Sequence, residues 1–178
     1  ASTGPLPQCI LLADVSQAYV YAPVNEDMYV DICDEARTAD SVGRCWKLLR
    51  SMYGTRPAAL IWQKELTRVL VKHAFTPGRA SPCTFHHPSR GISLFVHGDD
   101  FTFCGFEDLK WVLGMMRGWF EIKLRAILGS DPEGGKEGVI LGMLDGRTSG
   151  IEYEADPKHG KIVLDYLGFD EKSRSLSF

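Results

Sequence analysis

The chain has 178 residues, of which 44% are hydrophobic and 24% charged, and this balance fits one globular domain with its own core. The longest apolar runs have five residues, whereas a membrane-spanning helix needs about 18 or more, so the sequence predicts no such helix. Five cysteines without a C-x-x-C pair indicate free thiols in a reducing compartment and argue against a structural zinc site.

The net charge of −3 is unevenly distributed along the chain. Residues 1–43 carry seven acidic side chains and one basic, whereas residues 44–79 carry eight basic side chains and only Glu65 as an acid. Such a basic segment can follow a phosphate backbone. It can equally be a solvated helix face whose charges are neutralised by neighbours, and the charge pattern leaves both interpretations open.

The first third of the chain predicts short elements separated by loops. Residues 1–7 have neither the basic segment nor the apolar core of a signal peptide, and we expect a linker or a cut end there. Residues 8–13 are predicted as a strand and residues 15–21 as a short helix. Residues 28–32 alternate with the period of a half-buried strand, and residues 34–43 form a polar loop.

The clearest helix is predicted to begin near Pro57 and to end at Pro77-Gly78, because proline is favoured in the first turn of a helix. Its apolar residues recur at helical spacing along one face, and basic residues follow one another at four-residue steps along another. The apolar residues are Trp62, Leu66, Val69, Leu70 and Ala74, and the basic ones are Lys64, Arg68 and Lys72.

The remaining elements predict the fold class. Residues 84–87 and 92–96 flank a turn and indicate a hairpin, and residues 109–120 indicate a second helix. Residues 121–127 are predicted as a strand, and the chain is completed by strand-like segments at 139–144, 150–154 and 161–167, the last of them possible as a terminal helix. This order favours an α+β fold in which a largely antiparallel sheet has helices packed on one face.

Neighbouring histidines in the predicted hairpin do not indicate a metal site. His86 and His87 are consecutive residues of one strand, so their side chains should point to opposite faces of the sheet.

Adjacent carboxylates lie at a predicted tight turn between two apolar runs. Asp99 and Asp100 follow residues 94–96 and precede residues 101–104. Two carboxylates between buried strands repel each other and lose hydration, so a bound divalent cation would stabilise them. A turn also favours aspartate for local hydrogen bonds alone.

A third carboxylate, Asp14, ends an apolar strand. An aspartate there is ordinary as a helix N-cap. Together with Asp99 and Asp100 it gives three carboxylates at the ends of strands that could be neighbours in one sheet. Such carboxylates supply the hard oxygen ligands that two Mg²⁺ ions require.

These residues resemble the reverse transcriptase domain of copia-type LTR retrotransposon polyproteins, over about residues 10–169. Six segments carry the resemblance in the family's order: 14–19 (Asp-Val-Ser-Gln-Ala-Tyr), 25–30, 51–54 (Ser-Met-Tyr-Gly), 95–100, 120–123 and 140–143. The order of the six makes the resemblance specific.

The resemblance implies a polymerase palm that carries out RNA-directed DNA synthesis, with two Mg²⁺ ions (or Mn²⁺ as a substitute) serving nucleotidyl transfer to a primer 3′-hydroxyl. The implied partners are an RNA or DNA template with a DNA primer, deoxynucleoside triphosphates and the remainder of a Pol polyprotein, without a membrane. The implied location is intracellular, in a cytoplasmic virus-like particle or in the nucleus. Residues 8–178 are expected to form a single palm domain without fingers, and with thumb and ribonuclease H absent or truncated.

Carried over residue by residue, the resemblance implies catalysis by Asp14, Asp99 and Asp100, which would bind the metal ions together with the backbone carbonyl of Val15. It also implies that Tyr19 lies under the sugar of the incoming nucleotide, where its ring would clash with a ribose 2′-hydroxyl and select deoxynucleotides. A core aromatic is the alternative interpretation of Tyr19.

Further positions are implied to contact the nucleotide or the nucleic acid. Tyr53 and Gly54 would border the nucleotide, with Gly54 permitting close backbone approach. Lys123 would protonate the leaving pyrophosphate, or it is an exposed strand lysine. The residues implied to contact the template and primer are Arg50, Arg56, Lys64, His97 and Gly98.

Several departures from the family pattern keep a second function open. Pro57, Ala59 and Leu60 stand where the family has Gln, Pro and Arg, so two polar groups near the substrate are lost, and Gly98 replaces a Val or Met. The alternative is a catalytically inactive remnant that acts as a nucleic-acid-binding or assembly module. A two-metal nuclease would use the same carboxylates but leaves Tyr19 and the Tyr53-Gly54 pair unexplained.

Overall fold

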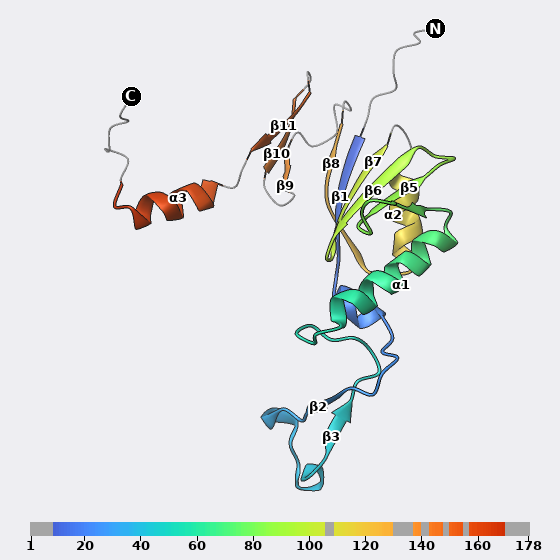
Figure 1. Ribbon diagram of the computed structural model, residues 1–178, viewed down its shortest axis with the longest axis vertical. Coiled ribbons are helices and arrows are strands. Elements are labelled where there is room, and N and C mark those ends of the chain that lie inside the picture. The colour runs from blue at the N-terminus through green and yellow to red at the C-terminus, as the bar shows by residue number, and fades with distance from the viewer. Residues whose placement is uncertain are drawn as a thin grey trace.

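A computed structural model describes residues 9–105, 109–129, 137–139, 143–147, 150–154 and 157–169 (Figure 1). Its centre is a six-stranded sheet in the order β4-β5-β6-β7-β1-β8, in which every neighbouring pair is antiparallel. The strands are β1 (Cys9–Val15), β4 (Thr76–Pro77), β5 (Thr84–His87), β6 (Ile92–His97), β7 (Asp100–Gly105) and β8 (Ile122–Leu128). The predicted α+β fold with a largely antiparallel sheet is confirmed.

One face of this sheet is covered by the helices α1 (Ala58–Lys72) and α2 (Leu109–Arg117). Residues alternate along β6 and β7 between buried and more exposed positions, as a sheet with one covered face requires. The covered positions of the strands share one core with the apolar faces of both helices, and this core includes Leu11, Ala13, Leu94, Val96, Phe101, Phe103, Trp62, Leu66, Leu70, Val112 and Met116.

The segment between β1 and α1 leaves the sheet as a ribbon. A 3₁₀ turn, η1 (Ala18–Tyr21), follows β1, and β2 (Tyr29–Asp31) pairs with β3 (Cys45–Lys47). The loop predicted at 34–43 contains two further 3₁₀ turns, η2 (Asp34–Ala36) and η3 (Ala39–Ser41). In Figure 1 the β2–β3 ribbon extends away from the six-stranded sheet.

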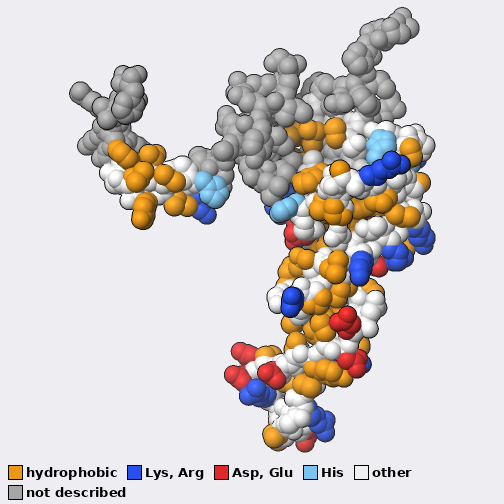
Figure 2. All heavy atoms as spheres, viewed as in Figure 1, with side chains coloured by type: hydrophobic (Ala, Val, Ile, Leu, Met, Phe, Trp, Pro, Cys, Tyr) orange, Lys and Arg blue, Asp and Glu red, His pale blue; other side chains and the backbone are white. Residues whose placement is uncertain are grey.

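The C-terminal part contains a second small sheet and a third helix. The small sheet has the order β11-β10-β9, from β9 (Glu137–Val139), β10 (Met143–Arg147) and β11 (Gly150–Glu154). Helix α3 (Pro157–Tyr166) occupies the segment predicted as strand-like or helical, and it lies apart from the main sheet (Figure 1). Figure 2 shows hydrophobic side chains over α3, where Val163 and Leu164 are exposed. Thus α1 and α2, but not α3, pack on the predicted face.

The predicted hairpin with its two histidines is present in the structure. The predicted hairpin is β5–β6, and His86 and His87 lie on opposite faces of it, with His87 buried between the rings of Phe75 and Trp111. Residues 1–7 and 140–142 lie outside the described residues. No helix in the described part of the chain is long and apolar enough to cross a membrane.

The expected end of the long helix at Pro77 is wrong, because α1 ends at Lys72. Ala74 adopts a left-handed conformation with φ of 64°, and its N–H donates to the Val71 carbonyl at 3.0 Å. The Phe75 N–H donates to the Leu70 carbonyl at 3.0 Å, and both of these side chains are buried. This is a Schellman motif with alanine where glycine is usual.

We therefore expect Ala74→Gly to stabilise the protein. An L-residue other than glycine pays about 1 kcal/mol in the left-handed region, and glycine removes this strain at the cost of a more flexible unfolded chain. The net gain in the free energy of unfolding should be about 0.5–1 kcal/mol in urea titrations. A loss of stability would contradict the assignment of this helix end.

Candidate active site

Four polar side chains form a row across the face of the sheet opposite α1 and α2, which we call the polar row. The strand registers pair His97 of β6 with Asp100 of β7, Asp100 with Asp14 of β1, and Asp14 with Lys123 of β8. Residues paired across strands point to the same face, and the next residues along, such as Ala13 and Phe101, lie in the core. The polar row therefore projects from the face opposite the two helices.

Asp99 joins this row through the tight turn between β6 and β7. His97 and Asp100 pair across a two-residue loop in which Gly98 has φ of 64°, as expected for the first central position of a type II′ turn. The Asp99 carbonyl accepts a hydrogen bond of 2.9 Å from the Val15 N–H. The turn is thus fixed to the end of β1, directly beside Asp14.

The same turn is also fixed to the helix layer. The Trp62 Nε1–H of α1 donates a hydrogen bond of 2.9 Å to the Gly98 carbonyl. Trp62 is 2% exposed and packs edge-on against Phe120, with ring centroids 5.1 Å apart. A buried indole N–H needs a partner, so the packing of Trp62 and the position of the turn depend on each other.

The carboxylates of this site repel one another. Partial burial raises the pKa of Asp100, and the neighbouring charges of Asp99 and Asp14 raise it further, while Arg125 and His97 oppose the shift. The Asp14 side chain is only 14% exposed, and Arg125 Nη2 lies 3.6 Å from its Oδ1. The site is therefore an anionic cluster with one guanidinium beside it.

Two tyrosines flank the turn. The rings of Tyr19, from η1, and Tyr53 have centroids 4.2 Å apart. Burial raises the pKa of Tyr53 and the charge of Asp99 raises it further, which places the Tyr53 hydroxyl within the field of the carboxylates. Tyr19 also packs against the core. Its position is therefore compatible both with a core aromatic and with a residue that lies under the nucleotide sugar. Gly54 follows with φ of 84°, and a side chain there would meet nothing within 4 Å.

The predicted nucleic-acid contacts do not gather at the polar row. The Arg50 guanidinium donates to the Tyr21 carbonyl at 3.0 Å, and Arg56 is exposed just before α1. Lys64 lies on the outer side of α1, away from its buried face, and therefore on the helix side of the sheet. Only His97 and Gly98 of this group adjoin the carboxylates.

Part of the basic segment is paired within the protein. Lys47 forms an ion pair with Asp27, and Arg68 forms a bidentate pair with Glu65. These pairs favour the neutralised-surface interpretation for part of residues 44–79.

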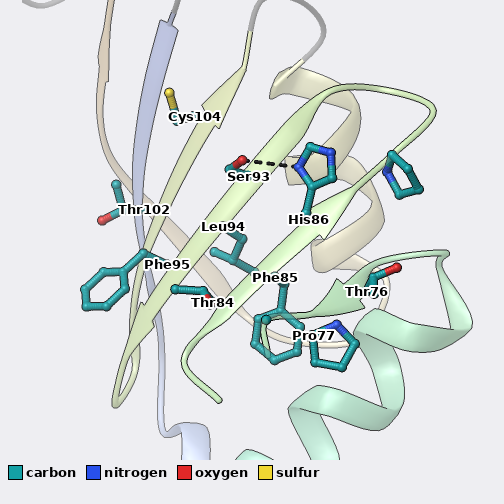
Figure 3. A pocket seen from close by; sticks show the side chains of 12 residues that line it. Thr76, Pro77, Thr84, Phe85, His86, Ser93, Leu94, Phe95, Thr102 and Cys104 are labelled. Atoms are coloured by element: carbon teal, nitrogen blue, oxygen red, sulfur yellow. Dashed lines mark hydrogen bonds between the residues drawn. The ribbon is translucent and has the colours of Figure 1, made fainter. Parts of the chain in front are cut away.

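A pocket of about 640 Å³ adjoins the polar row on the same face (Figure 3). Phe95 and Thr102 line it and form the next same-face pair after His97 and Asp100. Farther along, the Ser93 hydroxyl and a ring nitrogen of His86 share a hydrogen bond of 3.3 Å. The described residues that line it include no lysine, arginine, aspartate or glutamate.

The donor types at the polar row fit a hard cation. Asp14 and Asp100 offer carboxylate oxygens from adjacent strands at one register position, with Asp99 beside them, and such oxygens are what Mg²⁺ prefers. In the described part of the chain, however, no three His, Cys, Asp or Glu side chains are grouped closely enough to hold an ion. The donor atoms of these carboxylates therefore suit Mg²⁺. To bind one ion jointly, the three side chains would have to rotate toward a common point.

Sequence reasoning missed two residues of this site. Arg125 is the second basic residue of β8, after Lys123, and nothing in its spacing connects it with Asp14. The role of Trp62 in holding the turn had one usable signal, since a tryptophan on a buried helix face must find an acceptor for its N–H.

Replacing Trp62 with phenylalanine should weaken the fold at the turn. The variant leaves the Gly98 carbonyl without its donor and removes buried volume, so we expect a loss of about 1–3 kcal/mol in the free energy of unfolding. The matched control is Trp46→Phe on the exposed face of β3, with an expected change within about 0.5 kcal/mol. Equal effects of the two substitutions in urea titrations would contradict the proposed role of Trp62.

The raised pKa of Asp100 predicts a pH-dependent stability. Because the folded-state pKa lies above the unfolded value of about 3.9, the contribution of Asp100 is fully present below that value and is lost as the pH rises through the folded-state pKa. Asp100→Asn should therefore be more stable than the parent at neutral pH, and this gain should vanish in acid. Urea titrations at both pH values measure it, and a less stable variant at neutral pH would show the repulsion to be absent.

A profile of the family described as reverse transcriptase (RNA-dependent DNA polymerase) matches residues 8–124, well over half of the chain, including β1, α1, the β6–β7 turn and the start of β8. A search of curated proteins finds no match. The chain belongs to the reverse transcriptase (RNA-dependent DNA polymerase) family.

Proposed function

We propose that this chain is the palm of a copia-like RNA-directed DNA polymerase, which transfers a deoxynucleotide to a primer 3′-hydroxyl in a two-metal reaction. The observation that supports it best is the register that sets Asp14 beside Asp100 on adjacent strands and holds Asp99 at the adjoining turn. Polymer synthesis needs such carboxylates at an accessible edge, where a primer end and a nucleotide can meet.

The carboxylates of Asp14, Asp99 and Asp100, with the Val15 carbonyl, would hold two Mg²⁺ or Mn²⁺ ions. When bound, these ions would lower the pKa of the primer hydroxyl and neutralise charge on the transferred phosphate. The N–H and C=O of one strand residue point to the same neighbouring strand. Because the Val15 N–H donates to Asp99, its carbonyl also faces the turn.

The nucleotide would lie against the tyrosine pair. The Tyr19 ring, supported by Tyr53 at 4.2 Å and by the core behind it, is held firmly enough to exclude a ribose 2′-hydroxyl. Gly54, beside Tyr53, leaves open space for the approach of a base or sugar.

The residues at the two ends of the polar row would contact different groups, the leaving pyrophosphate and the primer terminus. Lys123 is paired with Asp14 and exposed on the same face, and it would give a proton to the leaving pyrophosphate. His97, at the other end, would contact the primer terminus together with Gly98. Arg50, Arg56 and Lys64 would contact template phosphates beyond the row.

A second candidate function is a nucleic-acid-binding or assembly module without polymerase activity. Two observations favour it: Pro57 and Leu60 replace the family's polar Gln and Arg at the start of α1, and Arg125 lies beside Asp14. The same chain would then bind a template–primer duplex without extending it.

Primer extension separates the two functions. We expect Mg²⁺- or Mn²⁺-dependent extension of a DNA primer on an RNA template, tested with this chain and with a longer polyprotein segment that contains it. Asp99→Asn should reduce the rate about a thousandfold or more, because several kcal/mol of transition-state stabilisation are lost. Asp40→Asn, the same change in the loop of the ribbon, is the matched control and should retain activity.

Duplex binding by both proteins is measured in parallel. Binding without extension in either form would refute the polymerase and leave the binding module. Extension that persists in Asp99→Asn would refute the assignment of the site.

A further inference from the structure

Strand β8 contains a bulge at the level of the polar row. Its register with β1 runs Leu12 to Ala126 and then Ala13 to Leu124, so Arg125 is an extra residue without a partner on β1. Bulges change the direction of side chains and are frequent near active sites. Here the extra residue is the one whose side chain reaches Asp14.

The two side chains of this ion pair differ in their exposure to solvent. Arg125 Nη2 lies 3.6 Å from Asp14 Oδ1, while the Arg125 side chain is 60% exposed and that of Asp14 14% exposed. The carboxylate is therefore held in place by the strand and largely removed from water. The guanidinium is mostly in solvent and its Nη2 lies beyond hydrogen-bond distance of Asp14 Oδ1, so it can move away into solvent.

We propose that Arg125 is a tethered counter-ion of Asp14 that competes with the divalent cation for this carboxylate. This inference rests on the proposed metal role of Asp14. A guanidinium and a metal ion cannot both occupy the same face of one carboxylate oxygen, and their charges repel at short range. Without metal, Arg125 compensates part of the charge of Asp14, Asp99 and Asp100; with metal, its side chain moves to solvent.

The arrangement of the site agrees with this competition. Within the described residues, no three carboxylates are grouped closely enough to hold an ion, whereas the Arg125 guanidinium lies 3.6 Å from Asp14. The metal-free chain thereby avoids three uncompensated carboxylates at one sheet edge, at the expense of a lower affinity for metal.

The test is Mn²⁺ binding to the whole chain, followed by electron paramagnetic resonance of the free ion. Arg125→Met should tighten binding about tenfold, because a positive charge is removed near a divalent ion in a partly screened site. Arg125→Lys should stay close to the parent. Arg117→Met removes the same charge at the end of α2, on the helix side, and should change nothing.

A double-mutant cycle assigns the effect to Asp14. In an Asp14→Asn background, Arg125→Met should no longer tighten Mn²⁺ binding. If the parent binds Mn²⁺ in an Asp14-dependent manner but Arg125→Met binds equally or more weakly, the counter-ion role is overturned and the polymerase proposal stands. If no Asp14-dependent binding occurs in any variant, both proposals are overturned.

Thermal unfolding gives a second readout independent of activity. Arg125→Met should have a lower Tm than the parent in EDTA, where the carboxylates lose their counter-ion. Millimolar Mg²⁺ should raise the Tm of the variant more than that of the parent. An equal rise in both proteins would contradict the competition, and Arg125→Gln repeats the test with a polar side chain.

Discussion

The hydrogen bond from the Trp62 indole to the Gly98 carbonyl connects the helix layer with the turn that carries Asp99. On its other side the turn is bonded to β1 through Val15, so α1, β1 and the β6–β7 hairpin meet at one point. The bond is partly buried and its donor Trp62 is only 2% exposed, so an unpaired indole N–H would cost more here than in water. The position of the turn that carries Asp99 therefore depends on the packing of Trp62, whereas the strand register sets Asp14 beside Asp100.

The strand register and the turn hold carboxylates close together although their charges repel one another. Asp14 and Asp100 face the same side at one register position. Partial burial and the repulsion of Asp99 and Asp14 raise the pKa of Asp100, which is a cost to the fold at neutral pH. Sites that must bind cations commonly give up stability in this way. The core beneath, with Phe101 and Phe103 of β7 packed against the helices, supplies the stability that keeps the strands in register. Arg125, from the bulge in β8, compensates part of the charge when no metal is bound.

The sequence was informative where local pattern and global fold agree. The apolar runs around Asp99-Asp100 predicted the hairpin turn, and the strand ending at Asp14 predicted the third carboxylate at the same edge. It was less informative where the structure depends on a single residue that does not follow the apolar periodicity of its helix or strand. Helix α1 ends at Lys72, five residues before Pro77, through a left-handed Ala74, and an extra residue in β8 brings Arg125 to Asp14. Neither a bulge nor an alanine cap has a composition signal, since both are fixed by tertiary packing.

We propose that Asp14, Asp99 and Asp100 form one metal site at the end of the sheet. Anomalous scattering from Mn²⁺ in crystals of the protein with a template–primer and a non-hydrolysable deoxynucleotide tests it most directly. We expect Mn²⁺ peaks between Asp14 and the β6–β7 turn, with the carboxylates rotated toward them and Arg125 turned away. Peaks elsewhere on the protein, with Arg125 still beside Asp14, would contradict the account.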